Sequence, residues 1–331
     1  MKRVEAGKPV IFTNVGNPHA LGQNPLTFMR QVLALVTAPF LLDDPVIMAR
    51  FPADAVARAK KYLSMIKGGV GAYSDSRGNG GVIQEVCDFL LRRDGVPADP
   101  KTIFLTNGAS EGVRMCLRAL LTCSGGKRGV LTPIPQYPLY TASVALYDGQ
   151  CCGYYLDEAN GWALSIPELE RSLAESRAAG IEVCALVFIN PGNPTGQCLS
   201  VQNLKDLIHF AVREKLVLFA DEVYQENVYI NSPFVSCRKV VADMGSPYTE
   251  SLELVNFHTV SKGAWGECGF RGGYFELMNV DPATNEELYK LASVNLSPNV
   301  PGQVPDLTST LTRSRVSRIL PAVCVCGRSR A

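Results

Sequence analysis

Residues 183–224 read VCALVFINPGNPTGQCLSVQNLKDLIHFAVREKLVLFADEVY. The continuous apolar run 183–190 predicts a buried strand, and the periodic pattern of 201–214 predicts an amphipathic helix. A second apolar run at 216–224 predicts another strand. Continuous apolar strands that alternate with amphipathic helices are typical of a mostly parallel sheet covered on both faces. This segment therefore predicts an α/β fold.

The same alternation runs along most of the chain. Amphipathic patterns predict helices at 25–36, 52–67, 82–93, 110–122, 165–178, 201–214 and 283–293. Short β-rich runs predict strands at 102–106, 129–133, 183–190, 216–224, 253–260 and 273–277. We find no internal repeat and no low-complexity linker, so we expect a central, mostly parallel sheet with flanking helices.

Composition excludes several classes of protein. The 331 residues are 47% hydrophobic and 19% charged, which favours a large core over disorder. The formal net charge is +1, so neither nucleic acid nor an anionic membrane is expected as a partner. The longest apolar run, 32–42, is too short to span a bilayer, and the start shows no secretory signal. Eleven cysteines without a CxxC pair indicate free thiols in a reducing compartment.

Ligands of parallel α/β sheets gather beyond the carboxyl ends of the strands, so the residues that follow each strand are informative. After 102–106, Ala109 and Ser110 open a helix, whose first N–H groups suit a phosphate. Ser110 could equally be a simple N-cap. After 183–190, the rigid turn PGNPTGQ presents Asn193, which could bind a ligand oxygen or only stabilise the turn.

Two charged residues follow the next two strands. Asp221 ends an apolar strand, so its carboxylate needs a partner, either a protonated ring nitrogen of a ligand or a nearby Arg or Lys. Lys262 follows 253–260, where desolvation would favour the neutral amine that condenses with an aldehyde. The other interpretation is a surface lysine in a glycine-rich loop. Arg271 could pair with a phosphate through its planar guanidinium.

The order of these residues along the chain is a stronger indication of function than any one residue alone. Asp221 lies 28 positions after Asn193 (221 − 193), and Lys262 lies 41 after Asp221 (262 − 221). A flat, phosphorylated pyridine aldehyde would use the helix start, the asparagine, the aspartate and the lysine together. We therefore interpret Lys262 as a Schiff-base lysine.

The motifs that hold these residues also carry a resemblance. NPGNPTG, DEVYQ and SKGAWGECGFRGGY resemble the fold-type I pyridoxal-phosphate aminotransferases, specifically the alanine aminotransferase branch. TNVGNPHALGQNPLTF, GAYSDSRG and PIPQYPLY look most like the plant and algal glutamate–glyoxylate aminotransferases. The similarity runs from about residue 10 to about residue 303. It implies pyridoxal 5'-phosphate as cofactor and ping-pong transfer of an amino group from alanine or glutamate to 2-oxoglutarate, pyruvate or glyoxylate.

The resemblance assigns a role to each matching residue. Lys262 would be the catalytic residue, joining the cofactor aldehyde and moving the substrate proton. Cofactor-binding roles are implied for Ala109, Ser110, Tyr137, Asn193, Asp221, Tyr224, Thr259 and Arg271. Tyr73 would reach the phosphate of a neighbouring subunit, which implies a homodimer. Gly16 and Asn193 would lie beside the substrate, and no metal site is predicted.

The resemblance also divides the chain. It implies an N-terminal arm with a small-domain segment (1–50), a large cofactor-binding domain (51–303) and a divergent, poorly ordered tail (304–331). The small domain would then be largely missing at the C-terminus, and its carboxylate-binding arginine cannot be mapped onto Arg313, Arg315 or Arg318. Two alternatives stay open, an inactive homologue that keeps only cofactor binding or dimerisation, and a pyridoxal-phosphate lyase. A cytoplasmic or peroxisomal location is expected, although the chain ends in Arg-Ser-Arg-Ala rather than a peroxisomal tripeptide.

Overall fold

Seven strands form one sheet in the part of the chain that the structure, a computed structural model, describes: residues 16–122, 126–229 and 233–304. The strands are β1 (Ile103–Thr106), β2 (Arg128–Ile134), β3 (Gln150–Tyr155), β4 (Glu182–Ile189), β5 (Val217–Asp221), β6 (Leu254–Thr259) and β7 (Gly273–Met278). Their order across the sheet is β1-β7-β6-β5-β4-β2-β3. Only β7 is antiparallel to its neighbours, so the expected mostly parallel sheet is confirmed.

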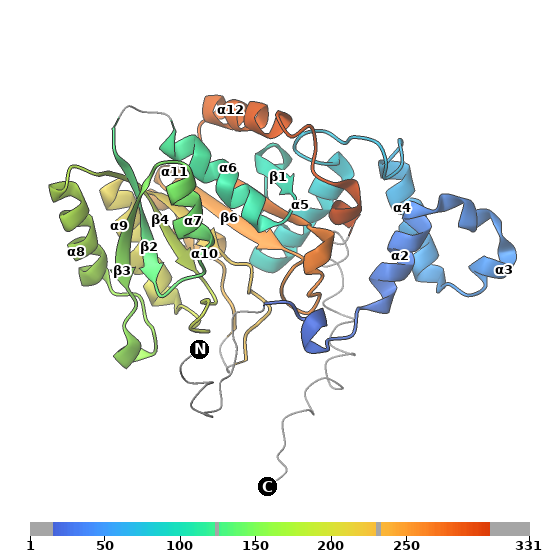
Figure 1. Cartoon of the computed structure of the whole chain (residues 1–331), viewed down its shortest axis with the longest axis horizontal. Coiled ribbons are helices and arrows are strands. Elements are labelled where there is room, and N and C mark those ends of the chain that lie inside the picture. The colour runs from blue at the N-terminus through green and yellow to red at the C-terminus, as the bar shows by residue number, and fades with distance from the viewer. Residues whose placement is uncertain (1–15, 123–125, 230–232, 305–331) are drawn as a thin grey trace, which may run out of the picture.

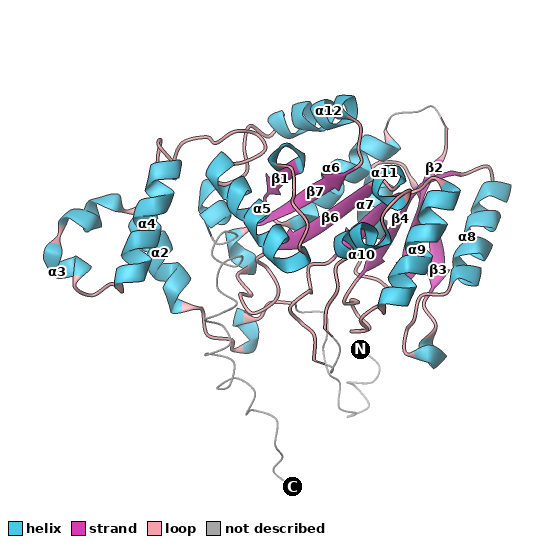
Figure 2. Ribbon diagram, turned by 180° about the vertical axis from the view of Figure 1, so that it is seen from behind, coloured by secondary structure: helices cyan, strands magenta, loops and turns pink. Residues whose placement is uncertain are grey.

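Helices cover both faces of this sheet, because its central strands are apolar on both sides. Figure 1 shows α6 (Ala109–Leu121), α7 (Leu139–Leu146) and α12 (Pro282–Ser293) in front of the sheet. Figure 2 shows α8 (Ile166–Ala178), α9 (Val201–Glu214) and α10 (Cys237–Met244) over the opposite face. The short α11 (Tyr248–Ser251) precedes β6. No helix in the described ranges is long and apolar enough to cross a membrane.

Side chains point alternately to the two faces of each strand, so the sheet has a separate core cluster on each face. On β4, Leu186 and Phe188 face α8 and α9, whereas Val187 and Ile189 face α6 and α7. On β5, Phe219 lies on the α6 side. Because strand side chains alternate, Asp221, two residues further on, belongs to the same face as Phe219.

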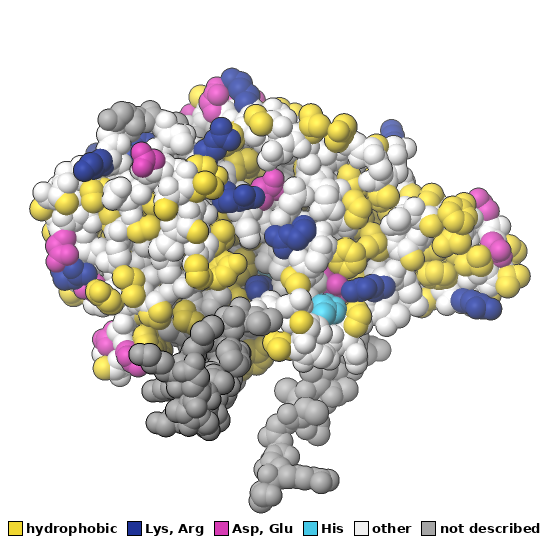
Figure 3. Space-filling view, viewed as in Figure 1, with side chains coloured by type: hydrophobic (Ala, Val, Ile, Leu, Met, Phe, Trp, Pro, Cys, Tyr) yellow, Lys and Arg dark blue, Asp and Glu magenta, His cyan; other side chains and the backbone are white. Residues whose placement is uncertain are grey.

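The N-terminal helices project from one end of the sheet (Figure 1). They are α2 (Thr27–Thr37), α3 (Pro45–Met48) and α4 (Ala53–Met65), and α2 packs on α4, whereas α5 (Gly80–Asp94) lies against the sheet beside β1. Apolar side chains gather on the projecting part (Figure 3), where Phe40 and Val46 are about 70% exposed. A third core cluster joins α2, α4 and α5 to Leu105 and Tyr274 at the edge of the sheet.

The predicted elements agree with the structure except at a few places. β5 ends at Asp221 rather than continuing to Tyr224, because residues 222–224 turn away to form the wall of a cavity. Sequence patterns missed the four-residue helices α3 and α11, and they also missed β3, α7 and α10. These are short elements of four to eight residues, whose apolar positions are too few to show a clear period. The described cysteines are free thiols as expected, although Cys151 is exposed rather than buried.

Candidate active site

The carboxyl ends of the strands meet at one edge of the sheet. Gly273 at the start of β7 lies between Thr106 and Thr259, the last residues of β1 and β6. Asp221 at the end of β5 pairs with Ile189 at the end of β4. The residues that follow these strands therefore converge on one place, although they are far apart in the sequence.

A cavity of about 230 Å³ lies at this edge. It is close to the lower end of the range of about 300–1,000 Å³ that is typical of small-molecule sites. Ten predicted site residues line it: Gly16, Ala109, Ser110, Tyr137, Asn193, Asp221, Tyr224, Thr259, Lys262 and Arg271. Tyr73 does not line the cavity, and its side chain is 78% exposed.

The first end of the cavity is formed by the start of α6. Gly108 has a φ of +83° and precedes Ala109, the first residue of the helix. The first N–H groups of a helix have no partner within it and carry the positive end of the helix dipole. Gly108 is the N-cap and Ser110 is already inside the helix, so the interpretation of Ser110 as a simple N-cap is wrong. Its position on the cavity leaves the phosphate interpretation in place.

Arg271 lies against the same helix start. Its guanidinium donates to the carbonyl oxygens of Asn107 and Cys268, at 3.0 and 2.9 Å, and to the Ser261 hydroxyl at 3.3 Å. These contacts fix the cation beside the N-terminus of α6. The Thr259 hydroxyl donates to the Gly272 carbonyl at 2.7 Å, which braces the backbone next to Arg271. Two sources of positive charge thus face one end of the cavity.

Asp221 lies deeper in the cavity wall and is 5% exposed. Its Oδ2 atom accepts a hydrogen bond from the Tyr140 hydroxyl at 2.6 Å, and Oδ1 accepts one from the Val223 N–H at 3.4 Å. Burial raises the pKa of Asp221, while these hydrogen bonds and the charge of Lys262 act in the opposite direction. Among the described residues Asp221 forms no ion pair, so they do not support the alternative of a salt bridge to Arg or Lys.

Two hydroxyl groups and an amide form the next part of the wall. The Asn193 amide donates to the Tyr224 hydroxyl at 3.1 Å. Burial and the charge of Asp221 raise the pKa of Tyr224 to about 12, so its hydroxyl keeps its proton at neutral pH. Tyr137 lines the same cavity and is 46% exposed. This part of the site can donate hydrogen bonds to a ligand oxygen.

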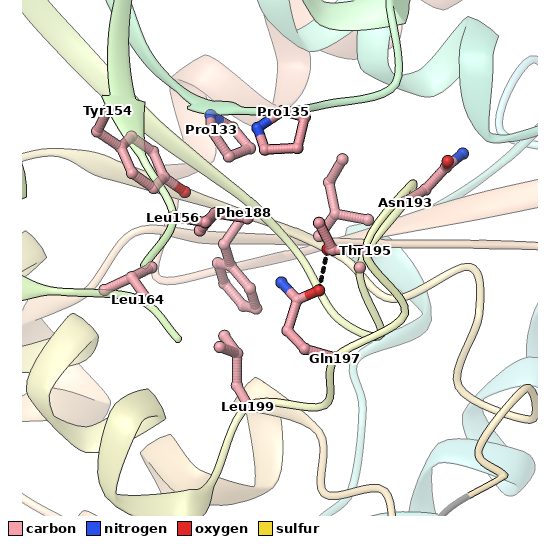
Figure 4. Close-up of a pocket in the computed structure, with 12 residues that line it drawn as sticks. Pro133, Pro135, Tyr154, Leu156, Leu164, Phe188, Asn193, Thr195, Gln197 and Leu199 are labelled. Carbon is pink, nitrogen blue, oxygen red and sulfur yellow. Dashed lines mark hydrogen bonds between the residues drawn. The ribbon is translucent and has the colours of Figure 1, made fainter. Parts of the chain in front are cut away.

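The turn that carries Asn193 rests on apolar side chains. Behind it lies a small space of about 10 Å³, lined by residues such as Pro133, Phe188 and Leu199, which is enough for one water at most (Figure 4). A hydrogen bond between Thr195 and Gln197 braces the turn, and the side chain of Asn193 is directed away from this space. The turn therefore presents Asn193 to the larger cavity.

Lys262 completes the site from the loop after β6. Its ammonium donates to the Gly16 carbonyl at 3.3 Å and lies 5.5 Å from the centre of the Tyr224 ring. The side chain is half-buried, so the desolvation expected for Lys262 is partial in this structure. The lysine lines the cavity, where its ammonium contacts the Gly16 carbonyl and the Tyr224 ring.

Sequence reasoning missed the residues that hold these side chains in place. Tyr140 buries its hydroxyl on Asp221. Asn227 accepts from the Gly263 N–H at 2.9 Å, and Glu226 accepts from the Ala264 N–H at 3.2 Å, so both fix the turn after Lys262. They follow Asp221 by five or six positions, but nothing in the sequence pairs them with a loop 36 or more residues away.

Solved structures show which fold this arrangement shares. An aminotransferase from Escherichia coli superposes with a TM-score of 0.73 at 24% identity, over 96% of this chain and 67% of its own. The alanine aminotransferase from Pyrococcus furiosus gives a TM-score of 0.71 at 21% identity, over 94% and 67% of the two chains. The chain therefore has the α/β fold of these aminotransferases, as the sequence predicted.

Curated relatives identify the family within this class. Glutamate–glyoxylate aminotransferase 1 of Arabidopsis thaliana is 58% identical over 299 residues, which are 90% of this chain and 62% of the relative. The probable mitochondrial alanine aminotransferase of Dictyostelium discoideum is 51% identical over 297 residues, 89% of this chain and 55% of the relative. The chain thus spans about three fifths of the length of such relatives.

The sequence matches the family described as aminotransferase class I and II over residues 47–315. The chain belongs to this family, and membership implies pyridoxal 5'-phosphate as the cofactor. The match continues past residue 303, into the stretch that sequence analysis set apart as a divergent tail. The predictions made for residues 305–331, including the arginines at 313, 315 and 318, lie outside the described residues.

Proposed function

We propose that this chain is a pyridoxal-phosphate transaminase of the alanine or glutamate–glyoxylate type. The observation that carries the proposal is the meeting of four chemical groups at one cavity. These are the positive start of α6 with Arg271, the buried carboxylate of Asp221, the hydrogen-bond donors Asn193 and Tyr224, and the amine of Lys262. The 58% identity to a glutamate–glyoxylate aminotransferase supports the same reaction class.

The residues at the cavity fit the cofactor chemically. A Cβ at Gly108 would overlap the guanidinium of Arg271, so the glycine lets this cation lie against the start of α6, where the helix N–H groups suit an anion. Asp221 is buried, no cation among the described residues forms an ion pair with it, and a protonated ring nitrogen would supply that partner. A phosphate and a pyridinium thus each have a complementary group at the two ends of the cavity.

Each residue then has a defined task. Pyridoxal phosphate, when bound, supplies an aldehyde that accepts an amino group and a ring that withdraws electrons from it. Ala109, Ser110, Thr259 and Arg271 would bind the phosphate, and Tyr137 would cover the ring. Asp221 would accept the hydrogen of the ring nitrogen.

The remaining residues act on the other polar groups. Asn193 and Tyr224 would donate to the phenolic oxygen. The Lys262 Nζ atom would accept the proton from the α-carbon of the substrate, beside Gly16.

A trapping experiment tests this assignment. The full chain is mixed with pyridoxal phosphate, reduced with borohydride and mapped by peptide mass spectrometry, and we expect a pyridoxyl group on Lys262. Lys262→Ala should lose that adduct and the visible absorbance, because no other described lysine lines the cavity. An adduct on a different lysine, or none in the wild-type chain, would contradict the proposal.

A half-reaction separates the proposed activity from its alternatives. Alanine or glutamate should convert the bound cofactor to its amine form with release of a 2-oxo acid, and glyoxylate, pyruvate or 2-oxoglutarate should reverse this. A chain that binds the cofactor but does not respond to the amino acids would be an inactive homologue. Release of pyruvate and ammonia, without any acceptor, from an amino acid that carries a leaving group on its β-carbon would indicate a lyase.

Assembly, domain division and location are further parts of the proposal. We propose a homodimer in which Tyr73, which is 78% exposed, reaches the partner's phosphate, and sedimentation of the full chain tests it. We also propose that the chain divides at residues 50 and 303 into an N-terminal arm with a small-domain segment, a large cofactor-binding domain and a tail. A cytoplasmic or peroxisomal location is proposed, although relatives such as that of Dictyostelium are named as mitochondrial, and fractionation of the native protein would decide between these compartments.

A further inference from the structure

Two segments that are far apart in the sequence run against each other at the rim of the cavity. We call residues 16–30 the entry segment and residues 262–270 the lysine loop. At one end of their contact, the Lys262 ammonium donates to the Gly16 carbonyl at 3.3 Å. The entry segment thus supplies the backbone that covers the proposed catalytic amine.

The contact continues along the lysine loop. Gln23 donates through its amide to the Ala264 carbonyl at 3.1 Å. A Cβ placed on Gly266 would lie 3.0 Å from the ring of Pro18, so the Pro18 side chain packs closely over the backbone of this glycine. Gly266 also has a φ of +59°, which favours glycine. No larger residue would let the entry segment lie this close to the loop.

Glu267 lies at the centre of this contact. Its side chain is 4% exposed, and it accepts hydrogen bonds from the Arg30 guanidinium at 3.0 and 3.3 Å. The His19 Nε2 atom lies 3.5 Å from the same carboxylate. Arg30 also lies over the ring of Phe270, 5.4 Å from its centre. The residues that pair with Glu267 therefore come from the entry segment.

Burial makes this ion pair a strong coupling between the segments. A buried carboxylate without its partner costs several kcal/mol, whereas an exposed pair contributes little. The Glu267 side chain is 4% exposed with Arg30 and His19 against it, whereas the Arg30 side chain is 47% exposed. Detachment of the entry segment would leave the carboxylate without its partners and remove Gly16 from Lys262. The position of Gly16 therefore depends on Glu267.

We propose that Glu267, through Arg30 and His19, is a positioning residue that clasps the entry segment to the lysine loop and so keeps Gly16 at the active-site rim. The contact between the two segments does not depend on which reaction the protein catalyses. Only the expected effect on substrate binding rests on the proposed function. Because Gly16 is expected beside the substrate, opening of the clasp should weaken substrate binding more than it slows the chemical step.

Hydrogen exchange of the full chain tests the clasp directly. Arg30→Met keeps the aliphatic stem and removes the charge, and Glu267→Gln keeps the shape of the carboxylate. In both variants we expect amides of residues 16–26 to exchange at least about tenfold faster than in the wild type, with α6 unchanged. Arg177→Met is the matched control, because Arg177 pairs with Glu214 at 2.7 Å with similar exposure, 51% against 47% for Arg30, far from the cavity.

Steady-state kinetics of Arg30→Met and of the conservative variant Arg30→Lys are the second test of the clasp. Arg30→Met should raise KM for the amino donor at least about fivefold with kcat within about twofold, and Arg30→Lys should restore part of the loss. Unchanged exchange at 16–26 in Arg30→Met, or equal changes in the Arg177→Met control, would overturn the clasp. A wild-type chain without transaminase activity would count against the proposed function, whereas the exchange experiment would still decide the clasp.

Discussion

Asp221 and Glu222 are neighbours in the sequence and have opposite environments in the fold. Asp221 faces the cavity beside Tyr140, whereas Glu222 is turned away from it and accepts a hydrogen bond from the Cys237 N–H at 2.7 Å. Both carboxylates are almost fully buried. Because both carboxylates are desolvated, the difference in their chemistry comes from the groups that contact each of them.

Tyr140→Phe tests the support of Asp221 at the scale of one residue. The hydroxyl is fully buried, and its loss leaves the carboxylate with one donor fewer. We expect a loss of about 1–3 kcal/mol in the free energy of unfolding, together with weaker binding of pyridoxal phosphate. Urea unfolding and a cofactor titration measure the two effects.

Tyr154→Phe is the control for this change. The Tyr154 hydroxyl is also buried, but it donates to the Val187 carbonyl at 2.8 Å, outside the cavity. This variant should lose stability and keep the cofactor affinity of the wild type. Equal losses of affinity in the two variants would show that Tyr140 has no specific role at Asp221.

At the scale of elements, the turn between β1 and α6 decides the shape of the end of the cavity where the phosphate is proposed to bind. Gly108 lets the chain turn with a φ of +83° and brings Arg271 against the helix start. Asn107 joins the same turn, since its carbonyl accepts from Arg271 and its side chain accepts from the Asn299 N–H at 2.8 Å. A strand, a helix and two distant loops thus depend on one residue without a side chain.

Gly108→Ala should therefore cost more than backbone strain alone. The added methyl group would overlap the Arg271 guanidinium, so we expect loss of about 1–3 kcal/mol of stability and at least a tenfold weaker binding of pyridoxal phosphate. Thermal unfolding and a cofactor titration are the measurements. Gly180→Ala is the control, because Gly180 has a φ of +74° with open space around its Cβ position. If Gly180→Ala weakened cofactor binding as much, the close approach at Gly108 would not be the cause.

At the scale of the whole molecule, a buried network of charges joins the ends of distant elements. Asp94 at the end of α5 pairs with Arg93 at 2.7 Å and with Arg238 of α10 at 3.4 Å. Arg238 also pairs with Glu276 of β7 at 2.9 Å. Glu222 lies among these charges, and burial raises its pKa to about 7. The network holds α5 and α10 to the sheet on the face opposite α6.

Glu222 gives a pH dependence whose sign follows from its pKa. The folded protein binds this proton more tightly than the unfolded chain, so the contribution of Glu222 to stability is complete below about pH 4.5 and falls as the pH rises to about 7. At about 1.4 kcal/mol per pKa unit, this amounts to about 3 kcal/mol. Glu222→Gln cannot titrate, so the wild type should lose stability relative to it between pH 5 and pH 8.

Urea unfolding of both proteins across this range measures the difference. His258 works in the opposite direction, since burial and Arg93 lower its pKa to about 3, but it is present in both proteins and cancels. A constant difference in stability between pH 5 and pH 8 would contradict the raised pKa of Glu222.

The features that could be predicted from the sequence are those that depend on the local pattern of apolar and polar residues. Long periodic segments such as 201–214 gave helices at the predicted bounds, and continuous apolar runs such as 183–190 gave central strands. Ten of the eleven predicted site residues lie on one cavity, because parallel strands bring their carboxyl ends to a single edge. Tyr140 and Glu267 could not be predicted, since each acts through a residue 81 or more positions away.

The sequence by itself determined the alternation of strands and helices, the family and the residues that can meet a phosphate, a ring nitrogen and an aldehyde. These follow from side-chain periodicity and from short motifs, which are local properties of the chain. Only the tertiary structure decided which groups support them. Burial of Asp221 on Tyr140, and of Glu267 beneath Arg30, depends on elements that come together only in the folded chain, and desolvation sets the strength of both contacts.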